Sequence, residues 1–135
     1  MFITPIRMKY VGSEQHTTSG MFFCLVSTDA LPLDKDNFRG VVVRTHLEQC
    51  GHWMMGNASI CGQRFTLSGS YGEDGLTMTV PKAIFDKCVP IPAELYEAWA
   101  HGGGWNGCGS EGEAMRKWAV ENIVALKKVA RMKTC

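Results

Sequence analysis

A glycine-rich stretch near the C-terminus contains the residues whose types are best suited to catalysis. It reads HGGGWNGCGS over residues 101–110 and leads into the longest helical pattern of the chain. Cys108 lies just before that helix, and the dipole at a helix N-terminus favours thiolate over thiol. With His52, His101 or His46 brought close by the fold, Cys108 could serve as the nucleophile of a small thiol hydrolase or transferase. A thiol-dependent enzyme is therefore one hypothesis.

The same stretch matches two other patterns that lack their required companions. Residues 101–104 resemble the H-G-G-G string near the oxyanion hole of some α/β-hydrolases, but the chain has no G-x-S-x-G nucleophile elbow. Residues 107–112 satisfy G-x-G-x-x-G, yet a helical pattern and not a strand precedes them. Glu111 and Glu113 would also repel an anion at that helix start. Neither a hydrolase, nor a dinucleotide site, nor any other cofactor is predicted.

Two further segments contain residue types that bind metals. Cys50 and His52, with Cys61 and either His101 or Cys108, have the ligand types for zinc, but structural zinc sites use two short-spaced pairs and no second pair is present. Residues 34–40 cluster acidic and amide oxygens, but the EF-hand pattern requires glycine and glutamate where this chain has Arg39 and Thr45. We predict no metal site and expect a solvated turn or short helix over residues 34–40, and whether Cys50, His52 and Cys61 bind zinc stays open.

Trp105 and Asn106 are candidates for a partner-binding site. Trp105 lies in the glycine-rich stretch, away from any amphipathic pattern, and an exposed tryptophan there would suit a binding anchor. The alternative is that Trp105 packs against the neighbouring helices as a core residue. We place His101 with these two residues in the predicted partner-binding set.

Positive charge gathers at the C-terminal end. It comes from Lys127, Lys128, Arg131 and Lys133. Cations there complement the helix dipole, and contact with nucleic acid is the alternative, with Arg7, Lys9 and Arg64 as additions. The net charge of +1 is not the basic excess of a protein that binds nucleic acid through bulk electrostatics.

The first part of the chain is predicted to form an antiparallel sheet. Short apolar or β-branched segments, bounded by turn residues, predict strands over residues 2–11, 21–28, 41–48, 53–59, 63–68 and 76–80. Polar loops are expected at 12–20 and 29–40. The Asp-Gly step within 70–75 favours a tight hairpin. Short connections indicate a meander of about five strands within residues 1–80.

The remainder is predicted to be helical. Helices are expected over 82–87, 93–101 and 111–132, with a stiff proline-containing elbow at 89–92. Ser110 and Glu113 form the S-x-x-E capping box that starts the last helix. The predicted fold class is α+β, with the sheet followed by three helices packed on one of its faces. The 135 residues fit a single domain.

The cellular setting follows from the N-terminus and the cysteines. Arg7 and Lys9 lie where a secretory signal needs its apolar centre, and the longest apolar run, 21–26, is too short to span a membrane. A cytoplasmic protein is expected. Its six cysteines include no C-x-x-C pair and are predicted to be free thiols, with Cys24 and Cys88 as small core residues.

No motif places the chain in a known family. Because every catalytic or cofactor pattern lacks a companion, we favour a non-enzymatic protein that binds a protein partner. In size and make-up the chain is similar to small accessory proteins of phages and plasmids, including inhibitors of host defence systems. The thiol enzyme and a nucleic-acid-binding regulator stay open as alternatives, and no feature predicts the oligomeric state.

Overall fold

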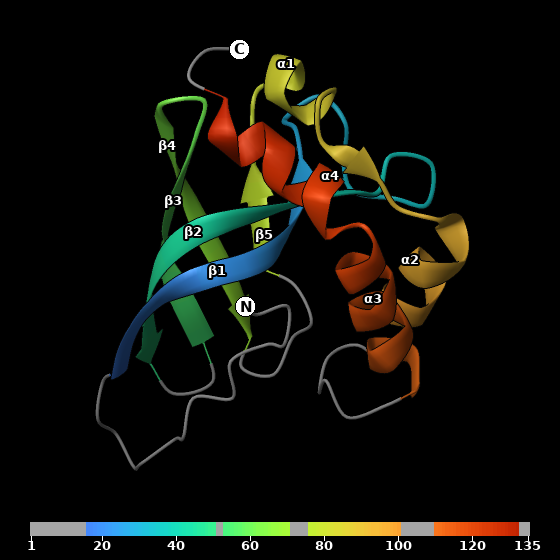
Figure 1. The fold of residues 1–135 in the computed structure, drawn as a ribbon, viewed down its shortest axis with the longest axis horizontal. Helices are drawn as coiled ribbons and strands as arrows, with labels where there is room; N and C mark the ends of the chain where they lie inside the picture. The colour runs from blue at the N-terminus through green and yellow to red at the C-terminus, as the bar shows by residue number, and fades with distance from the viewer. Residues whose placement is uncertain (1–15, 51–52, 71–75, 101–109, 133–135) are drawn as a thin grey trace.

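Six strands and a few short helices of the described residues form a mixed α+β fold (Figure 1). The computed structural model describes residues 16–50, 53–70, 76–100 and 110–132. The long strands are β1 His16–Ser27, β2 Arg39–Cys50, β3 Trp53–Ile60, β4 Gln63–Ser70 and β5 Leu76–Thr79. The strand expected over residues 2–11 and most of the 70–75 turn lie outside the described residues.

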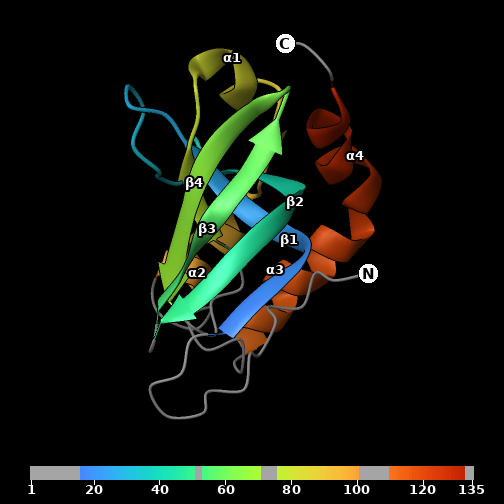
Figure 2. The same cartoon turned by 90° about the vertical axis from the view of Figure 1, so that its left-hand side faces the viewer.

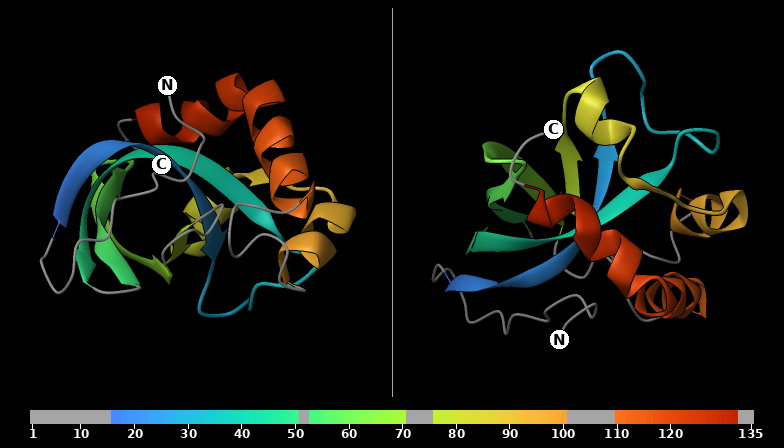
Figure 3. Two further views of the ribbon diagram at one scale, coloured as in Figure 1. Left: turned by 90° about the horizontal axis from the view of Figure 1, so that it is seen from below. Right: turned by 45° about the horizontal axis from the view of Figure 1, so that its top comes forward.

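The sheet is closed into a barrel (Figure 3). Each strand pairs antiparallel with the next, from β1 to β5. In such a meander the strand direction alternates, so the first and fifth strands run the same way. The closing pair of β1 with β5 is accordingly parallel, from Cys24 opposite Leu76 to Ser27 opposite Thr79. The predicted antiparallel meander is confirmed, and closure of the sheet was not foreseen.

The central parts of β1 and β2, residues 22–26 and 41–43, are buried on both faces. Phe22 and Cys24 point into the barrel core, while Phe23 and Leu25 belong to a second core outside the barrel. Val42 lies in that outer core, between two valines of the barrel core. Burial on both faces explains why these strands are continuous apolar runs in the sequence and do not alternate with polar residues.

Strand β1 begins earlier than the sequence indicates. Residues 16–20 were expected in a loop, but they pair with β2, from His16 opposite Gln49 to Gly20 opposite Thr45. The loop expected over residues 29–40 likewise ends early, because β2 begins at Arg39. The long ladder between β1 and β2 supplies backbone hydrogen bonds to polar residues whose own pattern predicts a loop.

The helices follow β5. They are α1 Lys82–Phe85, α2 Ala93–Ala100, α3 Ser110–Glu121 and α4 Ile123–Lys128, and a 3₁₀ turn, η2 Val129–Arg131, follows α4. Helices are found where 82–87 and 93–101 were predicted, although α1 ends at Phe85, and α3 begins at Ser110, one residue before the predicted helix start. In the expected elbow, β6 Val89–Pro90 pairs with Arg39 and Gly40 at the start of β2. No helix in the described part of the chain is long and apolar enough to cross a membrane.

The single helix predicted over 111–132 is divided at Asn122. Both the backbone N–H and the side-chain Nδ2 of Asn122 donate to the carbonyl oxygen of Trp118, at 3.0 and 2.8 Å. The backbone leaves helical geometry there, with φ −112° and ψ 19°. The break lets α3 pack beside α2, while α4 crosses β2.

The expected arrangement of three helices on one face is therefore wrong. Ile84 and Phe85 of α1 and Val129 of η2 belong to the barrel core. Residues of α2, α3 and α4 pack instead in the outer core against β1 and β2. Within the last helical segment, α3 and α4 therefore pack in the outer core, whereas η2 packs in the barrel core.

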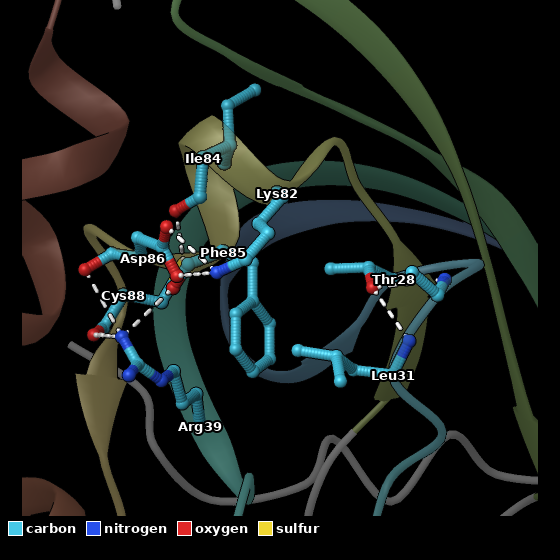
Figure 4. Close-up of polar contacts among 9 residues, drawn as sticks. Thr28, Leu31, Arg39, Lys82, Ile84, Phe85, Asp86 and Cys88 are labelled. Carbon is cyan, nitrogen blue, oxygen red and sulfur yellow. Dashed lines mark hydrogen bonds and ion pairs between the residues drawn. The ribbon is translucent and has the colours of Figure 1, made fainter.

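Arg39 fixes the end of α1 against the barrel (Figure 4). Its Nη1 donates to the carbonyl oxygens of Phe85, Asp86 and Cys88, at 3.2, 3.0 and 3.5 Å. The guanidinium also lies 4.6 Å from the centre of the Phe85 ring. Carbonyls at a helix end have no partner within the helix, so Arg39 satisfies them and holds α1 in place.

Candidate functional site

Most residues predicted to carry function lie outside the described residues. These are His52, His101, Trp105, Asn106, Cys108 and Lys133. The tryptophan anchor and the thiol enzyme both stay predictions. The surfaces described below come from the strands and helices on either side of these segments.

Cys61 corrects the expectation of free thiols. It lies in the turn between β3 and β4, with a positive φ of 54°, followed by Gly62 with a φ of 77°. Its side chain is buried and disulfide-bonded. A disulfide sulfur is not a thiolate, so Cys61 supplies no zinc ligand in this state. Among the described residues no group of three or more His, Cys, Asp or Glu could hold a metal ion.

Cys24 and Cys88 are free and buried, as the sequence predicts. Burial raises the pKa of the Cys88 thiol to about 12, although the nearby Arg39 lowers it. Burial, and secondarily Cys88, raises the pKa of Cys24 well above its ordinary value. The Cys88 thiol donates to the carbonyl oxygen of Ile84 at 3.3 Å, and the Cys24 thiol donates to that of Phe22 at 3.7 Å. Both thiols are protonated core groups and are not poised as nucleophiles.

The acidic segment at residues 34–40 uses its oxygens to form a turn. Asp34 Oδ1 accepts from the backbone N–H groups of Asp36 and Asn37, at 2.8 and 3.2 Å. Asn37 Oδ1 accepts in return from the backbone N–H of Asp34, at 2.7 Å. These local bonds are typical of Asx turns, so the prediction of a solvated turn is confirmed.

The basic C-terminal residues fall around a hollow on α4 and η2. The hollow has a volume of about 550 Å³ and is lined by Glu121, Asn122, Val124, Ala125, Lys128 and Arg131. Lys128 and Arg131 are exposed, whereas Lys127 is half-buried. Two of the four predicted basic residues are therefore brought together, and they border an apolar side chain.

Exposed valines accompany these cations. Val124, in the hollow, is 82% exposed, and Val120, beside Glu121 in the chain, is 57% exposed. Lys117 is exposed one turn earlier on α3. We call this region the α3–α4 surface, which comprises Lys117, Val120, Glu121, Val124, Lys128 and Arg131. Val124 therefore places an exposed apolar side chain between the cations that line the hollow.

Sequence reasoning missed the two valines. The buried stripe of the last helical segment was correctly placed at Met115, Ala119 and Leu126. Val120 and Val124 lie off that stripe, one before and one after the break at Asn122. Apolar residues outside the buried stripe were the signal that could have revealed this surface.

Comparison of the chain with protein families, with curated proteins and with solved structures gives no match. The function proposed below therefore rests on the side chains of this protein. On the α3–α4 surface, exposed apolar side chains, a hollow and positive charge coincide.

Proposed function

We propose that this chain is a non-enzymatic binding protein that captures a protein partner through the α3–α4 surface. The observation that carries the proposal is Val124, which is 82% exposed and lines a hollow of about 550 Å³. A partner that fills the hollow would remove this side chain from water. Burial of a valine contributes about 1.5 to 3 kcal/mol, which makes Val124 a natural centre for an interface.

The charges around the hollow indicate an acidic partner. Lys128 and Arg131 are the cations that line it, and Glu121 is the carboxylate beside them. Charges at the rim of an interface set the association rate and the choice of partner more than the affinity. We infer that the partner presents apolar side chains flanked by aspartate or glutamate.

An inhibitor or accessory protein of the phage or plasmid type would act in this way. Such a protein needs only to cover a surface of its target and requires no catalytic site. The size and make-up of the chain support this class, and the α3–α4 surface supplies the means of binding.

The variant Val124→Glu tests the proposal. Glutamate introduces a charge into the apolar centre and opposes an acidic partner, so capture should weaken at least about tenfold, which is about 1.4 kcal/mol. The melting temperature should stay unchanged because the side chain is exposed. The measurement is quantitative mass spectrometry of proteins retained by the tagged chain from a lysate of its own organism, followed by calorimetric titration of the purified partner.

Met55→Glu is the matched control. Met55 is 56% exposed, but it lies on β3 and not on the α3–α4 surface. Proteins retained by the wild type and by Met55→Glu, but lost with Val124→Glu, are the expected result. Equal retention by all three proteins, or equal loss in both variants, would contradict the proposal. Arg131→Glu should weaken the same partner most at low salt.

A further inference from the structure

The outer face of β3, β4 and the part of β2 from Arg44 onward is mainly polar and is not covered by helices (Figure 2). Side chains along each strand point alternately to the two faces of the sheet. Thr45, Ala58 and Leu67 are buried inside the barrel, so the residues next to them in the strands point outward. We call this region the polar barrel face, which comprises Arg44, His46, Asn57, Ser59, Arg64 and Thr66. Cross-strand pairs set His46 opposite Asn57, Asn57 opposite Thr66, and Ser59 opposite Arg64.

Two hollows lie on this side of the barrel and share Arg64. The first, of about 280 Å³, is lined by Arg44, Thr45, His46, Asn57, Ala58, Ser59 and Arg64. The second, of about 430 Å³, is lined by Ser27, Arg64, Phe65, Thr66, Ser68, Thr77, Met78 and Thr79. Arg64 is therefore placed to act in both hollows.

The lining has the chemistry of an anion site. No carboxylate lines either hollow. Among the described residues no ion pair involves Arg44 or Arg64, and both side chains are exposed. Guanidinium groups bind phosphate oxygens with geometric specificity, and hydroxyl and amide groups add further donors. Phosphate fits this combination better than a neutral ligand does.

The length of the site favours a chain of phosphates over a single one. Neighbouring strands lie about 4.8 Å apart, so the path from β2 to β5 spans about 14 Å. We propose that the polar barrel face binds the sugar–phosphate backbone of a single-stranded nucleic acid, with Arg44 and Arg64 contacting successive phosphates. A net charge of +1 is compatible with this site, because the contacts are local and the binding is salt-sensitive.

Fluorescence anisotropy with a labelled oligothymidylate tests the proposal. The full chain should bind at low salt, and Arg44→Gln and Arg64→Gln should each weaken binding about fivefold or more. Each substitution should also lower the slope of log affinity against log salt by about 0.7, because one phosphate contact is lost. Lys87→Gln, which removes an exposed cation beyond α1, is the charge-matched control and should bind as the wild type does.

Several outcomes would overturn the proposal. The first is no binding at low salt, and the second is equal weakening by Lys87→Gln and the two arginine variants. If inorganic phosphate at matched ionic strength binds as tightly as the oligonucleotide, the site takes single phosphates. If duplex DNA binds as tightly, the site is not specific for single strands. Val124→Glu should leave oligonucleotide binding unchanged, so failure of the partner proposal would not be mistaken for failure of this one.

Discussion

At the scale of single residues, burial determines what the free cysteines of the described chain can do. A thiol without solvent ionises with difficulty, since the thiolate loses its hydration. Cys88 is 2% exposed and Cys24 is fully buried. The same burial keeps these thiols protonated and unreactive. It also predicts that the folded state loses stability as the pH becomes alkaline.

The pH dependence is predicted to pass through Cys88. Its pKa is raised from an ordinary value of 9.0 to about 12. Because the folded pKa is the higher one, the stabilisation is fully present below the ordinary value and is lost as the pH rises towards the folded value. Urea unfolding at about pH 8 and about pH 10.5 should show the wild type losing about 1 to 2 kcal/mol more than Cys88→Ala.

The test compares how much the free energy of unfolding changes between the two pH values in each protein, and not its value at either pH. Cys88→Ala also removes the bond from Sγ to the carbonyl oxygen of Ile84, which lowers stability at both. Other groups that titrate in this range are common to both proteins and cancel. Equal losses in the wild type and the variant would show that Cys88 ionises normally in the folded protein.

At the scale of elements, two polar contacts at α1 differ greatly in expected strength. Arg39 is half-buried and donates to three backbone carbonyls. Lys82 and Asp86 form an ion pair at 2.9 Å, with side chains 63% and 50% exposed. Exposed ion pairs contribute about 0 to 1 kcal/mol, whereas hydrogen bonds that involve a charged group contribute about 1.5 to 3 kcal/mol.

Arg39→Met should therefore destabilise the protein by about 2 to 3 kcal/mol, and Lys82→Ala should cost less than about 1 kcal/mol. Methionine keeps much of the packing on Phe85 but donates no hydrogen bond. The measurement is the free energy of unfolding from urea titrations of the two variants. A smaller effect for Arg39→Met than for Lys82→Ala would mean that Arg39 does not hold the end of α1.

Local sequence patterns explain which of these elements could be predicted from the sequence. Strands β2, β3, β4 and β5 were predicted to within a few residues, because each is a short apolar or alternating segment between turn residues. The early start of β1 depends on a partner far along the chain, so no local pattern reveals it. The break at Asn122 depends on a side-chain bond to the Trp118 carbonyl inside a continuous amphipathic pattern.

The candidate surfaces were predictable only in part. Lys128, Arg131 and Arg64 were recognised from charge alone. The exposure of Val120 and Val124 depends on which helix face the barrel covers, and the grouping of Arg44 with Arg64 depends on strand register. Neither can be derived from residue spacing without the tertiary fold.

At the scale of the whole molecule, two cores share the same strands. The inner faces of β1 and β2 line the barrel core, and their outer faces contact the helices. Leu126 of α4 lies in the outer core, and Val129, three residues later, lies in the barrel core. Damage to either core should therefore weaken the other, because β1 and β2 cannot be lost from one core alone.

Leu126→Ala is predicted to destabilise both cores together. Truncation of a fully buried leucine costs about 2 to 5 kcal/mol, and Leu126 is 0% exposed. Hydrogen exchange measured by mass spectrometry should show the same loss of protection in α3, which packs in the outer core, and in β4, whose Leu67 lies in the barrel core. Val124→Ala, at an 82% exposed position, should leave both unchanged. Coupling of the two cores through β1 and β2 requires equal losses of exchange protection in α3 and β4. If Leu126→Ala lowered the protection of the helices but not that of β4, the barrel would be a separate cooperative unit.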